Sequence, residues 1–505
     1  MIPNDADFES KVSLESEFAA TIEEPPFHIL LLGDWSGSGD KPDLSQRRPM
    51  VIDRDNFDDT MRKFNARLDL DLYNDGKTLL PLRFIELDDF HPDKIFEQVS
   101  IFVNLRDIRQ RLLKSDTFNE AAREVSSWFN ADDKEKILTE EAPKNPSGAA
   151  SNIDSGNLLD QILSKPTENS APKSRTVHNT ELDELLGKLV KPYLVEIDET
   201  EQSKLLAAVD EATSGLMRLI LHNKQFQSLE AAWRALYFLV RRVETDVDLK
   251  IYLLNVSKDE VLGNLKSVNS LADSYLYKWI IRDTIETSGG EPWAVVGGNY
   301  TFGLNVDDVA TLIRLGKLAS AANAPFISHA RPEVSESPNS VYWNISNESN
   351  ESKLWTTLRS LPESSYLGFA VPRFLVRLPY GRDTDPLESF SFEEFLDMPN
   401  HDNYLWANPC FACILLLAQS YRLNGWEMNQ LCQDIEGLPT HIYREDMETI
   451  TKPCTEIALT VNASEKIIER GLMPLISFKD SDLIRLERFQ SIAYPLAALQ
   501  GKWNS

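Results

Sequence analysis

The chain has 505 residues, of which 42% are hydrophobic, and it contains 10 Trp and 23 Phe. This length and composition allow two to four domains with substantial cores, and they exclude a chain that is disordered throughout. The formal net charge of −27 repels phosphate backbones, so nucleic acid is excluded as an expected partner.

The sequence also constrains the compartment. No apolar stretch approaches the roughly 18–20 residues that cross a bilayer, and the start Met1–Asp5 lacks the basic and then apolar layout of a signal peptide. All four cysteines lie between Cys410 and Cys454, which is unlike a secreted disulfide framework. We therefore expect a cytoplasmic protein with reduced cysteines and no direct membrane insertion.

A buried strand is predicted near the start of the chain. Residues 1–24 are polar and acidic, and the apolar run Phe27–Leu32 that follows ends at Gly33 and Asp34, the pattern of a strand that leads into a turn. Further elements predicted in this segment are strands at Leu68–Tyr73 and Leu79–Leu87 and a helix over residues 93–114. The side chains expected to be covered at the end of the last strand are Leu82, Phe84 and Ile85.

The helix over residues 93–114 is predicted from its start and from its apolar stripe. The acidic run that begins at Asp88 suits the positive end of a helix dipole, and Pro92 suits a first turn. The stripe consists of Ile95, Val99, Phe102, Leu105 and Ile108. Its spacing is that of one face of an amphipathic helix.

The composition changes between residues 140 and 180, where Pro, Ser and Asn become frequent. Such a segment is too polar and too rich in proline to form a packed core, and we interpret it as a flexible linker. One short amphipathic segment at 157–164 interrupts it, with apolar residues at helical spacing: Leu158, Leu159, Ile162 and Leu163. An amphipathic turn inside a linker is a candidate docking peptide, and a stray helical turn is the alternative.

Long helical patterns and short strands alternate after residue 180. Helices are predicted near 205–220 and 228–243, and over 306–322, 409–424 and 463–470. Strands are predicted at 249–254, 293–297 and 369–371. This order predicts a mixed α/β (α+β) fold, with mixed sheets flanked by long helices.

Two motifs resemble parts of active sites. Cys410 and Cys413 form a CxxC motif, but it lies in an apolar run and no second CxxC is present, so buried helix packing is expected rather than redox or zinc chemistry. The run Gly297–Gly303 resembles a glycine-rich loop after a strand, but it lacks the Lys-Ser/Thr of a P-loop and the spacing of a dinucleotide fingerprint. A structural turn is expected there.

The remaining polar residues form no catalytic pattern. The seven histidines are scattered, with neither an HExxH motif nor a pair at ligand spacing, and no GxSxG motif occurs. The acidic pairs at Asp88-Asp89 and Asp307-Asp308 are expected at helix starts. We therefore expect no enzyme activity, no cofactor and no metal, while an unrecognised hydrolase or metal enzyme remains the alternative of a different class.

Both halves of the chain resemble subunits of one assembly. The motifs Pro26–Gly37, Ile52–Asp58 and Leu87–Pro92 resemble, in order and content, the small subunit (TssB/VipA-type) of the contractile sheath of the bacterial type VI secretion system. The resemblance implies that residues 1–139 form a small-subunit-like domain.

The second half resembles the large sheath subunit (TssC/VipB-type). The motifs that carry this resemblance follow the order of that family: Phe226–Leu239, Asn255–Lys258, Ala324–Ile327, Pro372–Gly381, Tyr404–Asn408 and Glu436–Pro439. Residues 181–505 are therefore expected to form a large-subunit-like region, joined to residues 1–139 by the linker 140–180. Large subunits ordinarily continue beyond the point that corresponds to Ser505, so this region is expected to lack the usual C-terminal section.

The resemblance implies a structural function in the bacterial cytoplasm. A sheath subunit assembles with other sheath subunits around an inner-tube protein and contracts to drive effector delivery. The alternative, suggested by the shortened C-terminus, is a sheath-derived cap, baseplate adaptor or assembly regulator that does not itself polymerise. The segment Leu158–Leu163 resembles the peptide that a ClpV-type AAA+ unfoldase recognises, and baseplate components are further partners that the resemblance implies.

Three arginines lie inside the motifs of the second half: Arg234, Arg373 and Arg377. In so acidic a chain they are expected to pair with carboxylates, either across an interface between subunits or within the core. Nearby aromatic residues are expected to be core rather than binding residues, namely Trp233, Phe374 and Trp406.

Overall fold

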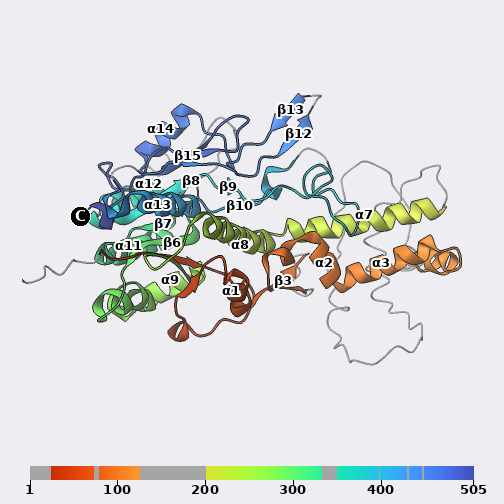
Figure 1. Ribbon diagram of the computed structural model, residues 1–505, viewed down its shortest axis with the longest axis horizontal. Helices are drawn as coiled ribbons and strands as arrows, with labels where there is room; N and C mark the ends of the chain where they lie inside the picture. The colour runs from red at the N-terminus through yellow and green to blue at the C-terminus, as the bar shows by residue number, and fades with distance from the viewer. Residues whose placement is uncertain are drawn as a thin grey trace, which may run out of the picture.

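The structure is a computed structural model that describes residues 24–72, 79–125, 201–331, 350–396, 399–428, 431–445 and 448–504 (Figure 1). A nine-stranded sheet forms the body of the described residues. Two packed helices, α3 (Ser100–Leu113) and α7 (Glu201–Leu221), extend away from that body (Figure 1). The predicted α+β class, with mixed sheets and long helices, is confirmed.

The sheet has the strand order β11-β15-β14-β8-β7-β6-β1-β5-β2. Its strands are β1 (Phe27–Gly33), β2 (Met50–Ile52), β5 (Leu249–Asn255), β6 (Trp293–Phe302), β7 (Phe326–Ala330), β8 (Leu367–Val371), β11 (Asp434–Ile435), β14 (Met473–Ser477) and β15 (Ile484–Leu486). The strands from β14 to β5 run parallel, and antiparallel strands complete both edges. Strands β6, β7 and β8 are joined in turn by the helices α11 (Val306–Ala322) and α12 (Asn350–Arg359), as parallel pairing requires.

Strand β1 of the first segment lies at the centre of this sheet. It pairs along its whole length with β5 on one side, and with β6 on the other, so that Leu30 lies between Tyr252 and Val296. All seven of its residues are buried. Because β5 and β6 belong to the second half of the chain, the two halves share one sheet and one core.

The side chains of β1 alternate between two apolar layers, as the pleat of a strand requires. Ile29 and Leu31 pack in the layer that includes α8 (Lys224–Arg242) and α13 (Cys410–Asn424). Leu30 and Leu32 pack in the opposite layer, which is built from α9 (Lys258–Ser267), α11 (Val306–Ala322) and α12 (Asn350–Arg359). Helices therefore cover both faces of the sheet, and this explains why its central strands are continuous apolar runs.

Smaller elements complete the described structure. Two-stranded sheets pair β3 (Ala66–Asp71) with β4 (Leu79–Phe84), β9 (Phe374–Leu375) with β10 (Trp406–Ala407) and β12 (Ile442–Glu445) with β13 (Glu448–Thr451). The other α-helices are α1 (Phe57–Phe64), α2 (Pro92–Gln98), α10 (Tyr275–Tyr277) and α14 (Val461–Glu469). The short 3-10 helices are η1 (Leu44–Gln46), η2 (Leu87–Phe90), η4 (Leu271–Asp273), η6 (Pro362–Tyr366), η7 (His401–Asn403), η8 (Gly425–Glu427) and η9 (Lys502–Asn504), and η5 (Lys278–Glu286) is a π-helix.

Most predicted elements are confirmed. The helices predicted at 205–220, 228–243, 306–322, 409–424 and 463–470 correspond to α7, α8, α11, α13 and α14. The strands predicted at 27–32, 68–73, 79–87, 249–254, 293–297 and 369–371 correspond to β1, β3, β4, β5, β6 and β8. No helix among the described residues is both long enough and apolar enough to cross a membrane.

The single helix predicted over residues 93–114 is wrong. The structure has two helices, α2 and α3, which meet at Val99, whose backbone is extended with φ −89° and ψ 121°. The whole predicted stripe is nevertheless buried. An apolar stripe reports which side chains face the core, and it is insensitive to one extended residue between two helices.

Two further predictions are corrected. Ile85 is 53% exposed, because β4 ends at Phe84 and the chain then turns into η2. The run that begins at Gly297 is not a turn but the continuation of β6 to Phe302. A Cβ atom on Gly297 would clash with the ends of the Ile414 and Leu31 side chains, so glycine lets α13 pack closely on the sheet.

Candidate functional site

Two of the predicted arginines, Arg234 and Arg377, form a buried ion-pair network next to α8. Glu230 on α8 is completely buried and accepts from both of them. Arg377 donates from Nε to Oε1 of Glu230 at 2.9 Å and from Nη1 to Oε2 of Glu394 at 2.8 Å. Arg234 lies one turn further along α8 and donates from Nε to the same Oε1 at 2.7 Å. The two cations and two anions therefore balance each other.

Tyr380 completes the ion-pair network. Its hydroxyl accepts from Nη2 of Arg234 at 2.9 Å, and the guanidinium carbon of Arg377 lies 4.4 Å from the centre of its ring. Its backbone N–H donates to Oε2 of Glu394 at 2.8 Å. Burial raises the pKa of Tyr380 to about 12, although the two arginines act in the opposite direction.

Glu394 stays ionised within the network. Burial alone would raise its pKa, but the charge of Arg377 and the hydrogen bonds from Arg377 and from the backbone of Tyr380 outweigh burial and lower the pKa to about 2. His222, just after α7, brings Nε2 to 3.4 Å from Oε1 of Glu394. The network therefore links the segment between β9 and β10 to α8 and to the end of α7.

Arg373 forms a separate pair. It donates from Nε and Nη2 to the two oxygens of Glu456, at 2.9 and 2.6 Å. Burial would raise the pKa of Glu456, but the hydrogen bonds from Arg373 hold it well below its usual range. Burial, reinforced by the charge of Arg373, lowers the pKa of nearby His329 to about 3. All three predicted arginines thus have carboxylate partners within this chain.

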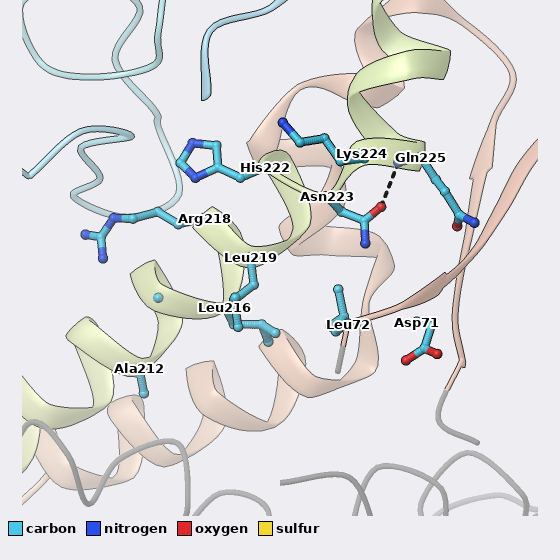
Figure 2. A pocket seen from close by; sticks show the side chains of 11 residues that line it. Asp71, Leu72, Ala212, Leu216, Arg218, Leu219, His222, Asn223, Lys224 and Gln225 are labelled. Atoms are coloured by element: carbon cyan, nitrogen blue, oxygen red, sulfur yellow. Dashed lines mark hydrogen bonds between the residues drawn. The ribbon is translucent and has the colours of Figure 1, made fainter. Parts of the chain in front are cut away.

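A groove of about 750 Å³ lies where α7 meets α8 (Figure 2). It is lined by Asp71, Leu72, Ala212, Gly215, Leu216, Arg218, Leu219, His222, Asn223, Lys224 and Gln225. Figure 2 shows Leu72 beside Leu216, while Arg218 and His222 point away from them. The Nε atom of Arg218 donates to the carbonyl oxygen of Glu393 at 3.0 Å. The groove combines apolar and polar walls, and its lining includes no nucleophile paired with a base.

The buried thiols are unsuited to catalysis. Cys410 and Cys413 are both 0% exposed, and burial raises the pKa of each thiol well above its ordinary value. A thiol in this state is neither an exposed nucleophile nor a metal ligand, so the predicted buried helix packing is confirmed. In the part of the chain that the structure describes, no group of three or more His, Cys, Asp and Glu side chains is arranged to hold a metal ion.

The other predicted binding residues, Leu158, Leu159, Ile162 and Leu163, lie outside the described residues. Their assignment to an unfoldase remains a prediction.

Comparison with known families identifies the second half of the chain. Residues 203–493, more than half of the chain, match the VipB family model, described as EvpB/VC_A0108, tail sheath N-terminal domain. The chain belongs to this tail sheath family. Residues 11–142 match a second model, described as type VI secretion system, VipA, VC_A0107 or Hcp2. One VipB-family chain therefore contains both kinds of sheath segment, as in a fusion of a small and a large subunit.

A curated relative supports the same assignment. The chain is 35% identical over 306 residues to the type VI secretion system sheath protein TssC1 of Pseudomonas aeruginosa. The match covers 58% of this chain and 61% of that relative, so the chain spans about three fifths of the relative's length.

Sequence reasoning found the arginines of this tail sheath protein but missed their partners. Glu230 could have been found, because it precedes Arg234 by four residues on one predicted helix face. Glu394 and Tyr380 gave no comparable signal, since both lie in an irregular segment and reach Arg377 only through the fold.

Proposed function

We propose that this chain is a structural subunit of a type VI contractile sheath. In this role it assembles with further copies of itself or with other sheath subunits around an inner-tube protein, in the bacterial cytoplasm, and contracts to drive effector delivery. The observation that carries the proposal is the presence of VipA-type and VipB-type segments in one chain. The role is mechanical rather than enzymatic.

The shared sheet supports a fused rather than an accessory arrangement of the two segments. Strand β1 lies within the VipA match, and both of its neighbours, β5 and β6, lie within the VipB match. Covalent connection fixes a one-to-one ratio of the two segments and raises their effective concentration. A single chain thereby forms the unit that two separate sheath subunits would otherwise have to assemble.

Contraction needs no bound cofactor in this proposal. Head-to-tail contacts that do not close into a ring generate a helical tube, and a tube held in a metastable extended state releases free energy when its subunits repack. The further partners that we propose are baseplate components and a ClpV-type unfoldase acting on residues 158–163.

Co-sedimentation tests the proposal. Purified full-length chain is mixed with an inner-tube protein and centrifuged, and each protein alone serves as a control. We expect both proteins to pellet together as regular tubes. Because unfolded aggregates also pellet, the destabilised variant Arg377→Met provides the control for amorphous material. A chain that stays in the supernatant and binds only the ends of sheaths assembled from separate subunits would instead be a cap or adaptor.

A further inference from the structure

A second, smaller cavity of about 190 Å³ lies beside the start of α8, and we call it the α8 cavity. It is lined by Lys224, Gln227, Ser228, Ala231, Ala232, Asn299, Thr301, Arg373, Asp402, Tyr404, Trp406 and Asn408. Asn299 and Thr301 are among the last four residues of β6, at the carboxyl end of a parallel strand. In open α/β sheets this end is where ligands bind.

The size of the α8 cavity limits what it can hold. Drug-sized ligands and cofactors occupy pockets of roughly 300–1,000 Å³, so a cavity of about 190 Å³ is too small for them. It matches a group of a few heavy atoms, such as the end of a polar side chain. The lining is mostly polar, which excludes an apolar anchor as the preferred occupant.

Two cationic side chains, Lys224 and Arg373, line the cavity although the chain is strongly acidic. The ammonium of Lys224 contacts two uncharged oxygens, Oε1 of Gln227 at 3.2 Å and the carbonyl of Asp402 at 3.1 Å. Lys224 is also the first residue of α8, where the helix dipole is positive and a cation is disfavoured. The ammonium of Lys224 and the dipole of α8 therefore both contribute positive potential at the cavity. Arg373 is a second cation in the lining.

Two acidic groups oppose this potential. Glu456 neutralises Arg373 through the bidentate pair, and the exposed carboxylate of Asp402 lies at the cavity itself. Lys224 is therefore the cation on which anion binding depends. The hydroxyl of Ser228 and the amide of Asn299 are neutral donors in the same lining.

We propose that the α8 cavity binds a carboxylate, held by the ammonium of Lys224 and by the neutral donors of its lining, and that an acidic side chain of a second copy of this chain supplies it. The chain has 79 Asp and Glu residues against 52 Lys and Arg, so every neighbouring copy presents carboxylates. The carboxylate site stands on the cavity alone, whereas its second-copy source rests on the proposed sheath function.

Titration with trifluoroacetate tests the site directly. Fluorine-19 line broadening is measured for the full-length chain, before assembly and at constant ionic strength. We expect saturable broadening, weakened at least about tenfold in Lys224→Ala, which is the effect of losing a hydrogen bond to a charged group. Asp402→Asn is expected to tighten binding, because it removes the opposing charge. Lys353→Ala, an exposed lysine on α12, is the matched control and should leave binding unchanged.

The outcomes test the carboxylate site and the source of the bound carboxylate separately. Broadening that does not saturate, or that is equal in wild type and Lys224→Ala, overturns the site. If the site binds, the same titration on assembled particles tests the source: we expect no broadening there, because a neighbour's carboxylate already fills the cavity. Equal binding before and after assembly overturns the second-copy source. A chain that never assembles contradicts the proposed function, and the first titration still decides the site.

Discussion

Replacing Arg377 by methionine removes the cation that lies between two buried carboxylates. Glu230 retains Arg234 at 2.7 Å after this change, so the loss falls on Glu394, which is only 2% exposed. Removing one partner of a buried ion pair leaves an uncompensated charge and costs about 3–5 kcal/mol. We expect the free energy of unfolding at pH 7 to fall by about that amount, a large fraction of the ~5–15 kcal/mol that stabilises a typical domain.

The pH dependence of the free energy of unfolding provides a second test, because it is expected to differ between the wild type and the variant. In the wild type the pKa of Glu394 is lowered from 4.5 to about 2, so its stabilising contribution is fully present above pH ~4.5 and is lost as the pH falls towards 2. A lowering of this size corresponds to about 3 kcal/mol. Without Arg377 the carboxyl is buried without its main cation, and its pKa rises above the unfolded value. The variant should therefore gain stability between pH 7 and pH 5, whereas this group makes no such contribution in the wild type.

Urea unfolding followed by tryptophan fluorescence at pH 5, 6 and 7 measures both effects. The double variant Arg377→Met with Glu394→Gln is the matched control, because it removes the stranded charge together with its partner, and it should recover at least half of the loss. An Arg377→Met variant within ~0.5 kcal/mol of the wild type at pH 7, or one whose stability does not rise on acidification, would refute this reasoning.

Three other predictions concern packing and the fusion. Gly297→Ala should destabilise the chain by about 1–3 kcal/mol through overpacking. Adding Ile414→Val should restore part of the loss in the same urea assay, because it removes Cδ1 of Ile414, the atom that the new Cβ would approach most closely; an additive loss would contradict the steric explanation. Cys410 and Cys413 should resist a thiol reagent in the native chain and react after denaturation, and fast native labelling of either would contradict their burial. A chain that lacks residues 1–125 should be insoluble alone, because it lacks the central strand β1, and soluble when residues 1–125 are co-expressed; independent folding of the shortened chain would contradict the shared core.

Local sequence patterns were sufficient to predict elements whose apolar residues follow one clear period. The helix Val306–Ala322 was predicted at both its ends, and the acidic pair Asp307-Asp308 was expected at a helix start. The structure adds the cap, because the side chain of Asn305 accepts from the backbone N–H of Asp308. The extended residue at Val99 was missed, since both helices that meet there present one continuous buried stripe. The Gly297 run was mistaken for a turn, because the reason for glycine is a side chain on α13 that approaches from more than 100 residues away.

The arrangement of the two halves could not be predicted from local sequence patterns. The run Phe27–Leu32 predicts a buried strand but carries no information about its neighbours, and those neighbours begin at Leu249 and Trp293. The candidate site divides in the same way. Arg377 stands in a recognisable motif, whereas Glu394 becomes its partner only when the irregular segment after β9 folds back onto α8.

Electron microscopy of the purified full-length chain, alone and with an inner-tube protein, tests the central claim most directly. If one chain contains both sheath segments in a single assembling unit, negatively stained samples should show hollow tubules of regular width, with one copy of the chain in each repeating unit of the wall. Persistent monomers or small oligomers under both conditions would contradict the claim.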